Sequence, residues 1–164
     1  MRTDKLTTRF QSALSDAQSI AIGRDNQFIE AQHVLMALLE QDASTVSQIL
    51  SNSGVNIADV KAKMQDAIER LPQVQGHQGD VQLSNELIRL LNQTDKLAQQ
   101  RNDQYISSEL FLLALVDAKT SASEILKSAG ADKKYIEQAI ENVRGGETVD
   151  DANAEENRQA LEKY

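Results

Sequence analysis

The chain has 164 residues, a formal charge of −8, one proline, seven glycines and no cysteine. Its length suits one domain, and its abundant alanine, leucine and long polar residues favour helix over sheet. Disulfides are excluded, and the acidic balance argues against nucleic acid, whose phosphates are neutralised by clustered Lys and Arg.

The first residues, 1–5, include an early acid and are not followed by an apolar run. A signal peptide needs a continuous apolar stretch, and a membrane span needs about 20 apolar residues. We therefore expect a cytoplasmic protein that does not bind membranes.

Four helices are expected in the first half, because apolar residues recur every three or four positions. They span residues 6–21, 29–39, 44–50 and 57–71. Gly23 and Pro72 interrupt the first and the fourth, and Gly54 stands where a left-handed residue would end the third.

Residues 72–83 are polar and contain glycine, which predicts a linker. Four more helices follow, with apolar residues at 87–98, 110–116, 125–126 and 136–143. Their expected first residues or caps are Ser84, Ser107, Ser121 and Asp132, and Gly145 and Gly146 close the last one.

The second half repeats the first. A shift of 77 positions superimposes identical residues, which are Leu14/Leu91, Ala21/Ala98, Arg24/Arg101, Gln27/Gln104, Ile29/Ile106, Leu35/Leu112, Ala37/Ala114 and Leu38/Leu115. The sequence predicts an all-α fold of two tandem four-helix pseudo-repeats, residues 1–72 and 84–146, packed as one domain over residues 1–146.

After Gly146 the composition becomes acidic and polar, without an apolar face. Residues 147–157 are therefore expected to be a mobile linker. Helical propensity returns at residues 160–164, where the sequence stops, so the linker, 147–164, is expected to lead into a further module.

No motif for catalysis is recognised. The sequence contains no Gly-Lys dipeptide for a phosphate-binding loop, no GxGxxG, no HExxH and no nucleophile elbow. We expect no catalytic residue, no nucleotide bound by this chain and no metal site.

One histidine and two pairs of adjacent acidic residues could be considered as metal ligands. His33 could bind a metal with Glu30 or Glu40, but a packed histidine near a helix start is the preferred interpretation. The pairs Asp150-Asp151 and Glu155-Glu156 lack the ligand spacing of a calcium loop, so solvated linker carboxylates explain them better.

Asp103 and Glu109 flank Tyr105-Ile106 and the expected cap, Ser107. An acid near a helix N-terminus is favourable, which accounts for Glu109. Asp103 lies four residues before the cap, where this effect explains it poorly.

Several motifs together resemble the N-terminal domains of the Clp-family AAA+ chaperones, most closely those of the protein disaggregases. The resemblance covers the whole chain and rests on residues 4–7 with Phe10, 26–30, 70–74, 95–99, 106–111, 144–147 and 160–164.

The resemblance implies a domain that captures unfolded or aggregated polypeptides for a longer, hexameric ATPase that uses ATP and Mg²⁺ and works with the DnaK chaperone system. The isolated domain is expected to be a monomer. An apolar groove between the first and sixth helices is implied, with polar positions at Thr7, Asp103 and Glu109. The apolar lining chosen here is Leu91, Leu97, Tyr105 and Leu110, each of which could instead be ordinary core.

Two alternatives remain open at this point. The same fold serves as an adaptor-docking domain in protease-linked Clp ATPases, and a passive helical spacer would need no client at all. An exposed apolar groove would argue against the spacer.

Overall fold

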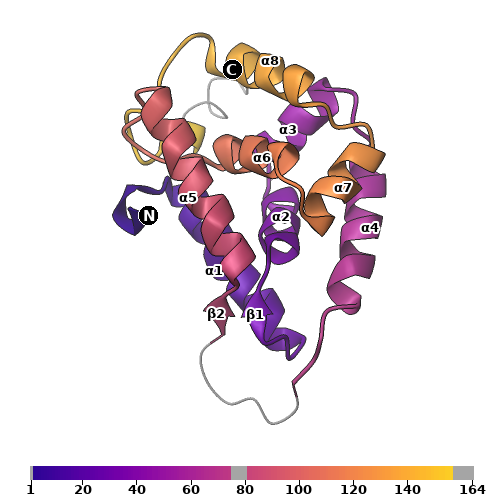
Figure 1. The fold of residues 1–164 in the computed structure, drawn as a ribbon. Coiled ribbons are helices and arrows are strands. Elements are labelled where there is room, and N and C mark those ends of the chain that lie inside the picture. The colour runs from indigo at the N-terminus through magenta and orange to yellow at the C-terminus, as the bar shows by residue number, and fades with distance from the viewer. Residues whose placement is uncertain (1, 75–80, 157–164) are drawn as a thin grey trace.

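The computed structural model describes residues 2–74 and 81–156 (Figure 1). A short 3-10 helix, Thr3–Lys5, precedes eight α-helices in this part of the chain. These are α1 (Thr8–Gly23), α2 (Ala31–Glu40), α3 (Thr45–Asn52), α4 (Ile57–Glu69), α5 (Asn85–Gln100), α6 (Ser108–Asp117), α7 (Ser121–Ser128) and α8 (Lys133–Arg144). The predicted all-α class is confirmed, with four helices in each half.

Several helix boundaries follow from local sequence. The Ser84 hydroxyl accepts the Leu87 N–H at 3.1 Å at the start of α5. Gly54, after α3, has a φ of +83°, and Gly145, after α8, has a φ of +59°. Side chains with a Cβ rarely adopt these values, so glycine suits both ends.

The two central helices, α2 and α6, form the middle of the core (Figure 1). All their residues except the last are buried. The rings of Phe10, on α1, and Phe111, on α6, lie 5.7 Å apart and join the repeats at the core. Farther out, α3 packs against α8 and α4 against α7.

The expectation of a fold without any sheet is wrong in one detail. Two short strands, β1 (Phe28–Ile29) and β2 (Gln82–Leu83), pair in parallel. Leu6 forms the corresponding parallel bridge with Ile106. Leu6 and Leu83 are 77 positions apart, as are Ile29 and Ile106, so the two pairings are equivalent in the repeats. In each, the loop before the second helix of one repeat pairs with the segment before the first helix of the other repeat.

In the part of the chain that the structure describes, no helix combines the length and apolarity needed to cross a membrane.

Candidate functional site

The candidate site lies where the N-terminal ends of α1 and α6 meet. The Thr7 N–H donates to the Ile106 carbonyl at 3.0 Å, and the Ile106 N–H donates to the Lys5 carbonyl at 2.7 Å. These bonds fix the start of α1 on the loop that leads into α6. The structure therefore brings Thr7 beside the loop that carries Asp103.

A buried ion cluster joins this loop to α8. Arg144 donates to both carboxylate oxygens of Asp103, at 3.1 and 2.9 Å, and to Glu109 Oε1 at 3.2 Å. It also donates to the Ser107 hydroxyl at 3.2 Å, while Ser107, at the N-cap of α6, makes no side-chain cap bond. Asn102, with a φ of +62°, turns the chain between α5 and Asp103.

The cluster is almost closed to water. The side chain of Arg144 is 4% exposed, and those of Asp103 and Glu109 are fully buried. Burial alone would lower the pKa of Arg144, but the attraction of Glu109 and Asp103 outweighs it and raises that pKa. Arg144 therefore stays charged and holds the loop to the end of α8.

The predicted polar positions are brought together, but not as an open rim. Thr7 and Glu109 are 0% exposed and Asp103 is 5% exposed. Asp103 and Glu109 lie four residues before and two after the cap, respectively, and both face Arg144, whose role the sequence analysis missed. The structure therefore places them inside the domain.

Residues 147–156, which we call the strap, were expected to be a mobile linker, but the structure packs them against the domain. The strap returns from the end of α8 to the start of α1 (Figure 1). Val149, the apolar residue that the composition argument overlooked, is 2% exposed. Its N–H donates to Asp103 Oδ1 at 3.0 Å, so the strap attaches directly to the ion cluster. The remainder of the expected linker, residues 157–164, lies outside the described residues.

Glu155 is the second buried anchor of the strap, with 2% exposure. Its Oε2 accepts the Ser108 N–H at 3.3 Å and a short hydrogen bond from the Thr7 hydroxyl. Thr7 and Ser108 stand at the N-terminal ends of α1 and α6. The positive ends of both helices therefore favour this carboxylate.

The predicted apolar lining does not form one surface. Leu91 and Leu110 are 1% and 0% exposed and belong to the core. Tyr105 is half-buried beside the Lys5 ammonium, which lies 5.5 Å from its ring centroid. Leu97 instead lines a pocket of about 300 Å³ between α5, α6 and α8.

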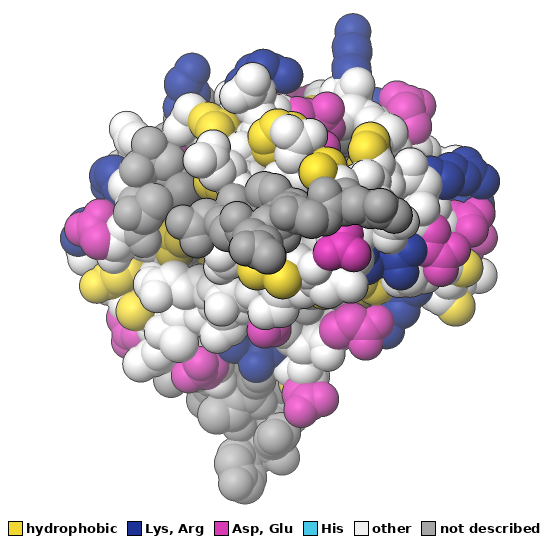
Figure 2. Space-filling view, turned by 90° about the horizontal axis from the view of Figure 1, so that it is seen from below, with side chains coloured by type: hydrophobic (Ala, Val, Ile, Leu, Met, Phe, Trp, Pro, Cys, Tyr) yellow, Lys and Arg dark blue, Asp and Glu magenta, His cyan; other side chains and the backbone are white. Residues whose placement is uncertain are grey.

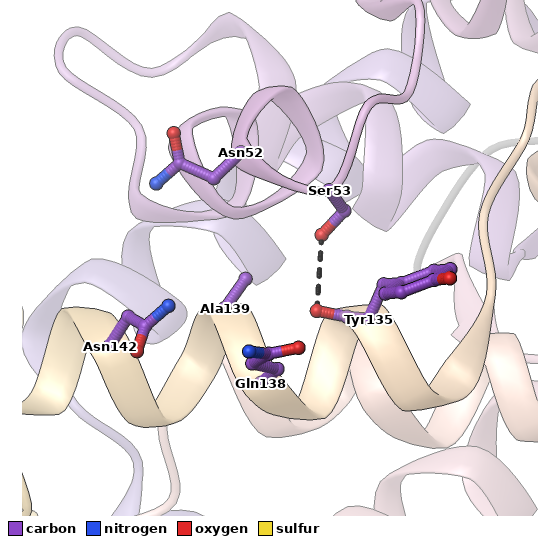
Figure 3. Close-up of a pocket in the computed structure, with 6 residues that line it drawn as sticks. All are labelled: Asn52, Ser53, Tyr135, Gln138, Ala139 and Asn142. Carbon is purple, nitrogen blue, oxygen red and sulfur yellow. Dashed lines mark hydrogen bonds between the residues drawn. The ribbon is translucent and has the colours of Figure 1, made fainter.

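A second pocket of about 300 Å³ lies between α3 and α8 (Figure 3). Its lining is mainly amide and hydroxyl groups, contributed by Asn52, Ser53, Tyr135, Gln138, Ala139 and Asn142. The Ser53 hydroxyl donates to the Tyr135 carbonyl at 3.5 Å across it. The residues that line it include no Asp, Glu, His, Lys or Arg.

Among the described residues, the large exposed apolar side chains are Ile22, Phe28, Ile88 and Tyr135. Figure 2 shows the end of the molecule that carries β1 and β2, where apolar atoms form separate patches among acidic and basic side chains.

His33 is a packed histidine with both ring nitrogens engaged. Its Nδ1 accepts the Glu30 N–H at 2.9 Å, and Nε2 lies 2.9 Å from Asn26 Oδ1. Burial, followed by the charge of Arg24, lowers the pKa of the ring to about 4. Among the described residues, no group of three or more histidine, cysteine or acidic side chains could hold a metal ion.

Arg144, Val149 and Glu155 were not among the predicted site residues. The first repeat shows a matching arrangement in the structure, because the segment after α4 also returns to its own repeat. Gln73 forms an antiparallel bridge with Asn26, and a shift of 77 positions moves that bridge to residues 150 and 103, beside Val149. Partners so distant in sequence leave no local periodicity.

Comparison with known proteins gives consistent results. Residues 5–129 match the family described as "Clp repeat (R) N-terminal domain". The whole chain is 49% identical to part of the chaperone protein ClpB of Pseudomonas putida, and it spans 19% of that protein's length.

Solved structures share the fold. The Hsp104 N-terminal domain of Candida albicans has a TM-score of 0.81 at 20% identity, covering 92% of this chain and 98% of the other. A ClpV N-domain in complex with a VipB peptide has a TM-score of 0.70 at 22% identity, covering 84% and 86%.

Proposed function

Because this chain belongs to the family of Clp repeat N-terminal domains, we propose that it captures polypeptide segments for an ATP-dependent protein disaggregase. The clients are exposed apolar stretches of unfolded or aggregated chains. The domain itself performs no chemistry. ATP and Mg²⁺ bind to other modules of the longer protein, a cytoplasmic hexamer that works with the DnaK chaperone system.

The observation that carries the proposal is the peptide-like binding of the strap across the start of α1 and the loop before α6. The Gln104 and Tyr105 N–H groups donate to the Val149 carbonyl at 2.8 and 3.2 Å. The Thr8 N–H donates to the Ala152 carbonyl at 2.9 Å. Backbone groups that bind a main chain accept many sequences, as capture of diverse clients requires.

Weak binding at each domain suits this function. A short apolar segment that buries about 400 Å² gains on the order of 10 kcal/mol. Association costs of about 4–15 kcal/mol remove most of that gain. Several such domains on one ring would raise the effective concentration of sites and hold a client by avidity.

Docking of a partner protein's defined peptide is the second candidate. The ClpV N-domain bound to a VipB peptide has the same fold and favours this alternative. A docking domain would select one sequence, whereas a capture domain would bind unrelated unfolded chains.

The test is titration of the isotope-labelled chain with a reduced, carboxymethylated protein that cannot fold, followed by amide chemical shifts. The matched control is the same protein in its native, disulfide-bonded form. We expect saturable shifts around Thr8, Gln104 and Tyr105 with the unfolded form only. Shifts with the native form as well would show that binding does not depend on unfolding and would contradict capture. No shift with either form would contradict capture too and would favour a docking domain or a passive spacer.

A further inference from the structure

Five acidic residues in the strap differ sharply in their surroundings. Glu147, Asp150, Asp151 and Glu156 are exposed. Glu155 alone among them is buried, with its carboxylate at the N-terminal ends of two helices. Solubility alone does not require a carboxylate to be buried, whereas Glu155 is hydrogen-bonded to Thr7 and Ser108. We therefore treat the Glu155 carboxylate as a specific anchor of the strap.

The other buried side chain of the strap, Val149, lies six positions earlier. Between these anchors, the strap binds mostly through its own backbone, by the Val149 N–H and carbonyl and the Ala152 carbonyl. One polar side-chain contact supplements them, from the Thr8 hydroxyl to Asn153 Oδ1 at 3.0 Å. The strap is thus held as a peptide ligand would be, at two side chains and a stretch of main chain.

We propose that the strap is an internal competitor that closes the polypeptide site, and that a client displaces it by supplying the same two features. The preferred client segment then carries an apolar residue followed, about six positions later, by a carboxylate. This inference rests on the proposed function, because it defines the regulation and the preference of that same site.

Tethering explains how a weak contact can regulate the site. A segment joined to the end of α8 by a short turn has an effective concentration on the order of millimolar. The strap competes at that effective concentration. A client must therefore bind the site more tightly than the strap does, or bind as part of a multivalent aggregate. Isolated folded proteins meet neither condition.

The test compares Glu155→Gln with the neighbouring control Glu156→Gln. Glu155→Gln removes the buried charge from the helix ends, whereas Glu156→Gln removes the same charge from an exposed position. The probe is a synthetic peptide of residues 146–156, and the control peptide carries Val149→Ser and Glu155→Gln.

We expect Glu155→Gln to bind the probe peptide roughly tenfold more tightly than the unmodified chain does, since a charge-assisted hydrogen bond of the strap is lost. Glu156→Gln should bind it as the unmodified chain does, and the control peptide should bind none of the three. Equal or weaker binding by Glu155→Gln would overturn the proposal. Circular dichroism confirms that both variants are folded before binding is compared.

A second measurement needs no substitution. Hydrogen exchange at the Val149 N–H, which donates to Asp103, reports whether the strap is in place. We expect its protection to fall as the unfolded client saturates the unmodified chain. If the client binds and Val149 stays protected, the strap proposal fails while client capture stands. If no client binds, capture fails, and the peptide comparison alone decides whether the strap competes.

Discussion

Arg144 donates hydrogen bonds to the buried carboxylates of both Asp103 and Glu109. Replacing it with methionine should lower the free energy of unfolding by about 3–5 kcal/mol, because two buried carboxylates would lose their hydrogen bonds to a buried cation. Urea denaturation at neutral pH measures the loss.

Arg70→Met is the matched control for Arg144→Met. Arg70 pairs with Asp66 at 3.3 Å, but its side chain is 79% exposed. Removing such a surface pair should cost less than about 1 kcal/mol. Equal effects of the two substitutions would contradict a stabilising role for the buried cluster. Because Asp103 and Glu109 are buried, replacing either with alanine should lower the stability of the domain. If they lined an open rim, the melting temperature would stay unchanged.

His33 should make stability depend on pH. Its pKa is about 4 in the folded chain against an ordinary value of 6.5, because burial disfavours the charged ring. Protonation therefore favours the unfolded chain. The contribution of the neutral ring is complete above pH 6.5 and is lost as the pH falls towards 4. We expect a loss of roughly 1 kcal/mol between about pH 7.5 and pH 5.5, measured by urea denaturation.

The control for this titration is His33→Gln. Its side-chain oxygen can still accept the Glu30 N–H, but it has no proton to gain in this range. The variant should be less stable at neutral pH and should lose less stability on acidification. Parallel pH profiles for the two proteins would show that another group titrates.

The helices illustrate what sequence reasoning can reach. Periodic apolar residues and local caps predicted all eight, because a helix is determined by neighbours three or four positions apart. The seventh helix begins at Ser121, as expected, and the Thr120 hydroxyl caps it. The first helix, expected at residues 6–21, instead spans Thr8–Gly23, a shift of two residues that leaves the fold unchanged.

The candidate site was predictable only in part. Thr7, Asp103 and Glu109 were singled out and do lie close together, but burial is decided by the elements that cover them. The strap covers Thr7 and Asp103, while Arg144 of α8 lies against Asp103 and Glu109. The composition of the strap is that of a solvated linker. Two buried side chains in ten residues do not produce a pattern, so their partners could be identified only in three dimensions.

The repeats should unfold together. Phe10 and Phe111 join their central regions, and each repeat supplies an extended segment to the other. Calorimetry should therefore show a single transition with equal calorimetric and van't Hoff enthalpies. Two transitions would mean that residues 1–72 and 84–146 are separate folding units.

Equivalent core substitutions sharpen this prediction. Leu35 and Leu112 occupy matching positions in α2 and α6, and both are 0% exposed. Alanine at either position should lower the same single transition, by about 2–5 kcal/mol. A variant in which only part of the transition moves would show that the repeats melt independently.

The crossed pairing of Leu6 with Ile106 and of β1 with β2 also bears on how such a fold could arise. A chain with one repeat alone would have both an unpaired loop and an unpaired leading segment. Two identical copies would satisfy both by exchanging segments across a two-fold axis. Gene fusion of such a homodimer ancestor would leave the pairing intact while freeing its two halves to diverge. The neutral Asn26–His33 pair in one half and the charged Asp103–Arg144 pair in the other are differences of that kind.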